Sequence, residues 1–111
     1  MNIQFFGDFT DERLAEVRAV ARERGHQEST PADVVFLMAY PRNIPLVAEA
    51  AKLGKEPKCV LVMRVTQPRV QEERAFFKTR LVTDIVDAPF NVVQTVHMFQ
   101  ALEAVDTSSL R

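Results

Sequence analysis

Apolar runs typical of buried strands alternate along the chain with segments that have the apolar periodicity of helices. The runs at residues 33–40 (DVVFLMAY) and 58–65 (KCVLVMRV) are continuous and rich in β-formers, as in strands buried on both faces. Shorter runs at residues 2–6 and 81–87 complete the pattern. Strands that alternate with helices form parallel sheets covered on both faces. We therefore predict an α/β domain with a doubly wound parallel sheet of four to five strands.

Capping residues, prolines and glycines mark the helices between these runs. The start signals are Thr10 or Asp8, Pro45, Thr66 with Pro68, and Asn91 with Gln94 at the capping-box position; the end signals are Gly25 and Gly54. Residues 26–32 (HQESTPA) leave room for a brief strand but not for a full helix, so the second strand–helix unit is expected to be abbreviated. We predict one domain over residues 1–105 and a flexible tail over 106–111.

Composition limits the classes of partner. The net charge is -1, from 14 basic and 15 acidic residues, and phosphate binding usually leaves a basic excess, so no nucleic-acid partner is expected. No apolar run approaches the ~20 residues of a membrane span, so we expect no membrane partner and a cytoplasmic location. The single cysteine, Cys59, lies in an apolar run and is interpreted as a small buried hydrophobe.

Four short stretches resemble the receiver domain of response regulators, which has a flavodoxin-like fold. They are the first strand, acidic turn and helix at 5–25, the strand at 32–41 (ADVVFLMAYP), the strand at 60–66 (VLVMRVT) and the junction at 84–91 (DIVDAPFN). The interval from Thr66 to Ala88 matches the family's spacing between its hydroxyl residue and its lysine. The resemblance also implies a cis peptide bond between Ala88 and Pro89.

The resemblance further implies a phosphorylation pocket that has lost its chemistry. Receivers hold Mg²⁺ with two acids and an aspartate that accepts the phosphoryl group, and a Ser/Thr and a Lys bind the phosphoryl oxygens. The matching positions here are Gly7, Asp8, Leu37, Met38, Thr66 and Ala88. They retain one carboxylate and the hydroxyl, and lack the nucleophile and the lysine. We therefore predict a degenerate pseudo-receiver that is not an enzyme and uses no metal or cofactor.

The same resemblance indicates an interaction surface on the fourth helix, fifth strand and fifth helix, which receivers use for dimers or output. The candidate residues are Phe76, Phe77, Arg80, Asp87, Thr95 and Met98. Phe76 and Phe77 are adjacent on one helix, so at most one easily faces the core. The alternative, that both rings are buried beneath neighbouring elements, carries about equal weight.

These observations leave three hypotheses for function. The leading one is a regulatory module of signal transduction that acts without phosphorylation, by binding unidentified proteins or by self-association. The second is a small flavodoxin-like enzyme or nucleotide-binding subunit that uses the strand ends near 7–10, 40–43 and 66–68, with polar groups from Arg42, Asn43 and Gln67. The third is a structural component that docks through the abbreviated second strand.

Three other polar residues are given structural interpretations in preference to functional ones. Asp8 is interpreted as a helix cap in preference to a relic metal ligand. His26 follows a helix end and is expected to be a solvated surface residue, whereas His97 lies mid-helix among apolar neighbours and is interpreted as structural.

Overall fold

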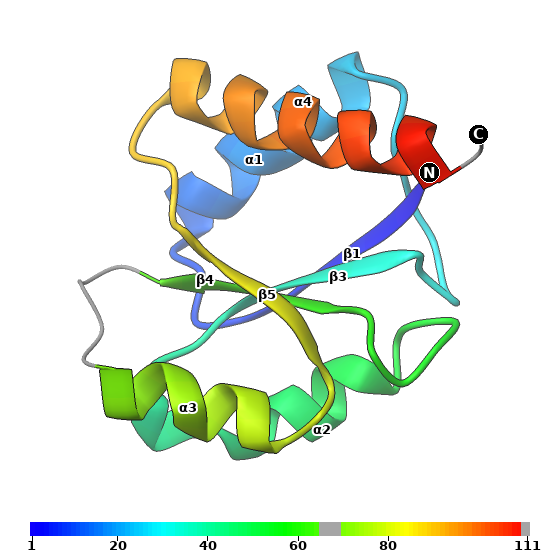
Figure 1. Ribbon diagram of the computed structural model, residues 1–111. Helices are drawn as coiled ribbons and strands as arrows, with labels where there is room; N and C mark the ends of the chain where they lie inside the picture. Colours follow the sequence, from blue (N-terminus) through cyan, green and yellow to red (C-terminus); the bar gives the residue numbers. More distant parts are fainter. Residues whose placement is uncertain (65–69, 110–111) are drawn as a thin grey trace.

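The computed structural model describes the backbone of residues 1–64 and 70–109, and the side chains of these residues apart from Pro41 and 105–109. This part of the chain contains five strands and four α-helices, which alternate except that β3 follows β2 directly (Figure 1). The strands are β1 (Asn2–Gly7), β2 (Gln27–Glu28), β3 (Val34–Met38), β4 (Val60–Arg64) and β5 (Val82–Asp87). The helices are α1 (Asp11–Glu23), α2 (Pro45–Ala51), α3 (Val70–Lys78) and α4 (Val92–Ser109), with a 3-10 turn at Pro41–Asn43.

The strands form one sheet in the order β2-β1-β3-β4-β5, and every pairing is parallel. This is the flavodoxin-like order, in which the chain winds both ways from β1. The predicted doubly wound α/β fold is therefore confirmed. The abbreviated second unit is confirmed too, because β2 has two residues and no helix connects it to β3.

Helices cover both faces of the sheet: α1 and α4 lie on one face, α2 and α3 on the other (Figure 1). Successive side chains of β3 point to opposite faces of the sheet, so alternate residues pack in two separate hydrophobic cores. Val35 and Leu37 pack on the α2–α3 side, and Phe36 and Met38 on the α1–α4 side. All four side chains are buried.

The caps of α1 and α4 are present, with one change of partner, whereas the predicted start at Thr66 and Pro68 lies outside the described residues. The Thr10 hydroxyl accepts the Arg13 amide N–H at 3.2 Å at the start of α1. Asn91 Oδ1 accepts the Gln94 amide N–H at 2.9 Å at the start of α4, while Gln94 Oε1 accepts from the Phe90 amide at 2.7 Å rather than from Asn91. Helix α4 continues to Ser109 and so includes residues 106–109 of the predicted tail.

One expectation about the backbone is wrong. Among the described residues the cis peptide bond is Thr30–Pro31, and Ala88–Pro89 is trans. The β5–α4 junction therefore keeps the proline without the isomer that the receiver resemblance implies.

A polar cluster ties α4 to the end of α1. The Glu103 carboxylate of α4 accepts a hydrogen bond from Arg24 Nε at 2.8 Å and lies 2.9 Å from His26 Nε2. The His26 ring is 5% exposed and stacks on Phe99, with centroids 5.2 Å apart. The prediction that His26 is a solvated surface residue is therefore wrong. The hydrogen bond and charge of Arg24, with the bond to His26, lower the pKa of Glu103 to about 2.

We expect Glu103→Gln to destabilise the fold by about 1–2 kcal/mol at pH 7, since partial exposure reduces the value that the pKa shift implies. Because the folded-state pKa of Glu103 lies below its unfolded value, this contribution is present above about pH 5 and is lost as the pH falls toward 2. Urea unfolding measured between pH 7 and 2 checks this. Glu16→Gln, at a 3.5 Å pair with Arg13 within α1, is the matched control and should change stability little. An equal loss of stability from both substitutions, or a loss from Glu103→Gln that does not depend on pH, would contradict this role of Glu103.

Candidate functional site

At the carboxyl ends of β1 and β3, the residues predicted to match a receiver's acidic turn are in close backbone contact with β3. Gly7 pairs with Met38 across the two strands, and the Asp8 amide donates to the Met38 carbonyl at 2.7 Å. Gly7 has a φ of 98°, and a Cβ placed there would lie 2.3 Å from the Met38 carbonyl oxygen. No L side chain fits this position without moving backbone, so a second acid cannot simply be added to this turn.

The carboxylate of Asp8 is engaged with a neighbouring side chain. Asp8 Oδ2 accepts from Asn43 Nδ2 at 2.6 Å, so the interpretation of Asp8 as a helix cap is wrong, and Thr10 fills that role. The Arg42 guanidinium lies over the Tyr40 ring at 5.1 Å. Two of the three polar groups considered for a nucleotide or enzyme site thus contact side chains of this chain. The third, Gln67, lies outside the described residues.

Apolar side chains occupy the other positions that match the pocket. Leu37 is fully buried on the α2–α3 side, whereas Met38 and Ala88 are buried together on the α1–α4 side. Leu37 and Met38 therefore point to opposite faces and do not line one site. Thr66 lies outside the described residues. Across residues 1–64 and 70–109, no three His, Cys, Asp or Glu side chains come together as a metal site.

Gly7→Asp tests whether this edge tolerates the missing acid. We expect a loss of about 3 kcal/mol or more, because a Cβ meets backbone at a positive φ. Added Mg²⁺ should not recover the loss. Thermal unfolding with and without Mg²⁺ measures both quantities, with Gly25→Asp as the control. Gly25 also has a positive φ (82°), but a Cβ added there would meet nothing within 4 Å. The control therefore measures the destabilisation caused by the positive φ without the steric clash. A stable Gly7→Asp variant that gains stability from Mg²⁺ would contradict this.

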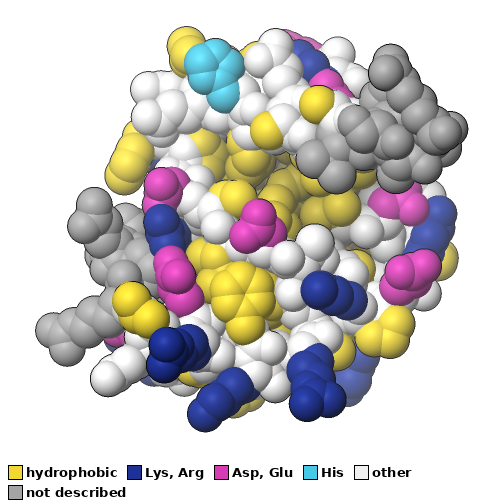
Figure 2. Space-filling view, in the orientation of Figure 1, with side chains coloured by type: hydrophobic (Ala, Val, Ile, Leu, Met, Phe, Trp, Pro, Cys, Tyr) yellow, Lys and Arg dark blue, Asp and Glu magenta, His cyan; other side chains and the backbone are white. Residues whose placement is uncertain are grey.

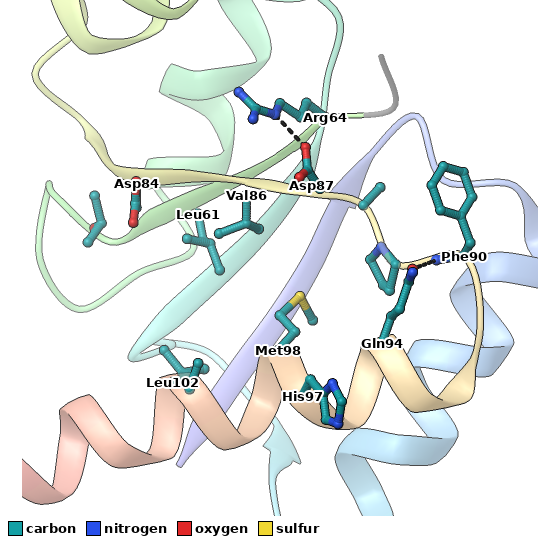
Figure 3. A pocket seen from close by; sticks show the side chains of 14 residues that line it. Leu61, Arg64, Asp84, Val86, Asp87, Phe90, Gln94, His97, Met98 and Leu102 are labelled. Atoms are coloured by element: carbon teal, nitrogen blue, oxygen red, sulfur yellow. Dashed lines mark hydrogen bonds and ion pairs between the residues drawn. The ribbon is translucent and has the colours of Figure 1, made fainter. Parts of the chain in front are cut away.

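An apolar groove of about 790 Å³ lies between β5 and α4 (Figures 2 and 3). Leu61 and Val86 of the sheet, with Ala88, form its floor, and Met98, Ala101 and Leu102 of α4 form one wall. In Figure 2 the hydrophobic side chains gather in this hollow, above the β5 edge. Polar side chains stand around the rim: Arg64, Thr83, Asp84, Asp87, Gln94 and His97.

The two carboxylates on the β5 rim differ in their partners. Asp87 Oδ1 lies 2.6 Å from Arg64 Nε, and the same guanidinium pairs with Glu73 of α3, so one cation is shared by two carboxylates. Asp84 Oδ1 accepts the amide N–H of Ile85 at 2.8 Å and has no ion-pair partner among the described residues. In Figure 3 Asp84 lies beside Leu61 at the groove. The groove thus combines apolar walls with a carboxylate, Asp84, that forms no ion pair with the described part of the chain.

The six predicted contact residues divide into two groups. Phe76 is 4% exposed and Thr95 is 1% exposed, with its hydroxyl donating to the Asn91 carbonyl at 2.9 Å, so both predictions are wrong. Phe77 is 45% exposed, and Arg80 and Asp87 are exposed. Met98 is half-buried and lines the groove. The choice between Phe76 and Phe77 is thereby resolved: Phe76 packs in the core and Phe77 faces outward.

The groove itself was not predicted from the sequence. The sequence pattern that could have indicated it is the distribution of apolar residues in α4, which are not confined to one face of the helix. Phe99 packs in the core, Met98 and Leu102 border the groove, and Val92 and Val93 are more than half exposed. A helix that is apolar on several sides is normally covered on several sides. His97, interpreted as structural, is exposed on the groove rim.

The chain matches no protein-family model, and it has no significant sequence match to a curated protein. None of the helices in the described part of the chain is long and apolar enough to cross a membrane. Cys59 is 4% exposed, and burial raises the pKa of its thiol, which confirms its interpretation as a small buried hydrophobe.

Proposed function

We propose that this chain is a non-catalytic, receiver-like regulatory module that acts by protein contact through the groove side of β5 and α4, without phosphorylation. One observation carries the proposal: an apolar groove borders the last strand of the sheet, and the described residues of the chain leave it open. Apolar surface of this kind on a small domain often marks a partner site.

The energetics of the groove favour a macromolecular partner. Full burial of one aliphatic side chain is worth roughly 1.5–3 kcal/mol. Val86, Met98 and Leu102, which line the groove, are each partly exposed and together offer apolar area to a partner. The polar rim resembles the rim of protein interfaces, which surrounds an apolar centre. At the carboxyl ends of β1 and β3, by contrast, a Cβ at Gly7 would meet the Met38 carbonyl oxygen, and the positions matched to the receiver nucleophile and lysine carry Met38 and Ala88.

A phosphoryl mimic tests the claim that the protein acts without phosphorylation. We expect beryllium fluoride with Mg²⁺ to leave the amide chemical shifts of the protein unchanged, because the positions that match the receiver nucleophile and lysine are Met38 and Ala88. Two-dimensional ¹H–¹⁵N spectra recorded with and without the mimic measure this. Shifts clustered at Asp8, Met38 and Thr66 would show a working phosphorylation pocket and refute the proposal.

Variants of the groove test the claim that the protein binds a partner there. Wild-type protein, Met98→Glu and Ala48→Glu are immobilised and exposed to lysate of the native cell. Met98 lines the groove, and Ala48 is exposed on α2 across the sheet, so Ala48→Glu is the matched control. We expect at least one protein to be retained by wild type and Ala48→Glu and lost from Met98→Glu, since a charge in the groove removes its apolar contacts. Identical retention by all three, or none, would count against a contact role.

A further inference from the structure

The edge of the sheet at β1 is only partly paired. Strand β1 has six residues, Asn2–Gly7, whereas β2 pairs with Asn2 and Ile3 alone. The ladder ends where the Ser29 amide donates to the Ile3 carbonyl at 3.2 Å. Residues 4–7 of β1 therefore have β3 on one side and, in the described part of the chain, no strand on the other.

The backbone groups on the open side follow from the alternation along β1. Successive residues of a strand turn their backbone groups to opposite neighbours. The Asp8 amide donates to the Met38 carbonyl on β3 at 2.7 Å, whereas Ile3 bonds on the β2 side. Phe5 and Gly7 therefore turn their amides to the open side, as Ile3 does. Neither amide has a hydrogen-bond partner in residues 1–64 and 70–109, and Gly7 is exposed.

After Ser29 the chain leaves this edge instead of continuing along it. Ala32 is fully buried in the core on the α2–α3 side, and its amide donates to the Leu53 carbonyl at 2.8 Å. The Thr30 hydroxyl accepts from Gln4 Nε2 at 3.0 Å. The chain thus reaches β3 on the α2–α3 side of the sheet, and β2 stops after two residues.

The side chains beside the open edge differ between the two faces of the sheet. On the α1–α4 side, Phe5 and Phe9 are partly buried and make an edge-to-face pair with ring centroids 5.9 Å apart. On the α2–α3 side, Gln4 and Thr30 present polar groups. A strand placed beside this edge would direct alternate side chains to the two faces. The edge therefore fits a segment in which apolar and small polar residues alternate.

The opposite edge of the sheet is protected against pairing, and this one is not. On β5 the Ile85 amide donates to Asp84 Oδ1 at 2.8 Å, so a side chain occupies a backbone donor of that edge strand. Charged residues and prolines are common devices against strand addition at an edge. Residues 2–7 contain neither a charged residue nor a proline. The edge of β1 thus remains available for backbone pairing.

We propose that the open edge of β1 binds an extended segment of another protein, which adds to the sheet as a strand beside residues 4–7. The Phe5 and Gly7 amides donate to carbonyls of the segment, and the Phe5 carbonyl accepts from one of its amides. Donors and acceptors that alternate along an edge match a polypeptide backbone in the extended conformation. The site and the groove lie toward opposite ends of the strand order, so this inference is independent of the proposed function.

Hydrogen exchange tests whether the edge is open in the free protein. We expect the Phe5 amide to exchange at least about tenfold faster than the amides of Gln4 and Phe6, which face β3. All three residues belong to one strand, so opening of the whole strand would affect them equally. Exchange followed by ¹H–¹⁵N spectra measures the three rates. Equal protection of the three amides would overturn the open edge.

A model peptide tests binding. The probe is a capped peptide in which valine and threonine alternate between two terminal lysines, and it is titrated to millimolar concentration. We expect changes in chemical shift centred on the amides of Phe5 and Gly7, and exchange of the Phe5 amide slowed at least about tenfold. No change in shift at millimolar peptide, or changes centred on Met98 and Leu102 in the groove, would overturn the edge site.

Two methylated forms of the peptide are the matched controls. Successive amides of a strand point to opposite edges, so N-methylation of the valines blocks one edge of the peptide and N-methylation of the threonines blocks the other. We expect one form to bind as the unmodified peptide does and the other to lose binding. Binding of both forms, or of neither, would overturn strand addition. A protein that is dimeric without peptide and has a protected Phe5 amide would assign the edge to a second copy and overturn the proposal.

Discussion

The Glu103 carboxylate, which holds Arg24 and His26, is the interaction on which the arrangement of this molecule depends. It fixes α4 to the end of α1, and stacking of the His26 ring on Phe99 continues the attachment into the core. β5 is the strand at the far edge of the sheet from β2, and the groove lies between it and α4. One side of α4 thus packs on α1 and the core, while Met98, Ala101 and Leu102 border the groove.

The carboxyl ends of β1 and β3 differ in chemistry from the groove beside β5. At the carboxyl ends of β1 and β3, Gly7 at positive φ and the nearby Met38 carbonyl leave no room for a side chain, and Met38 and Ala88 fill the core beneath. Beside β5, apolar side chains remain accessible and Asp84 lacks an ion-pair partner among the described residues. Apolar contact is therefore available beside β5, whereas a side chain at the position of Gly7 would clash with the backbone.

The sequence predicted the features that local physics determines. Continuous apolar runs identified the buried strands, the short stretch at 26–32 predicted the reduced β2, and Asn91 marked the start of α4. It did not predict the burial of His26, because the side chain that binds it is 77 residues away. Helical periodicity likewise could not decide between Phe76 and Phe77, and it could not show that Thr95 is buried, since both depend on where neighbouring elements pack.

The most direct test of contact through the groove is photo-crosslinking in the native cell, with a photoreactive amino acid placed at the position of Met98 in the groove or, as the control, of Ala48 on α2. We expect a crosslinked protein from the groove position that is absent from the control position. No crosslink from the groove position, or the same crosslinks from both positions, would contradict a contact role for the groove.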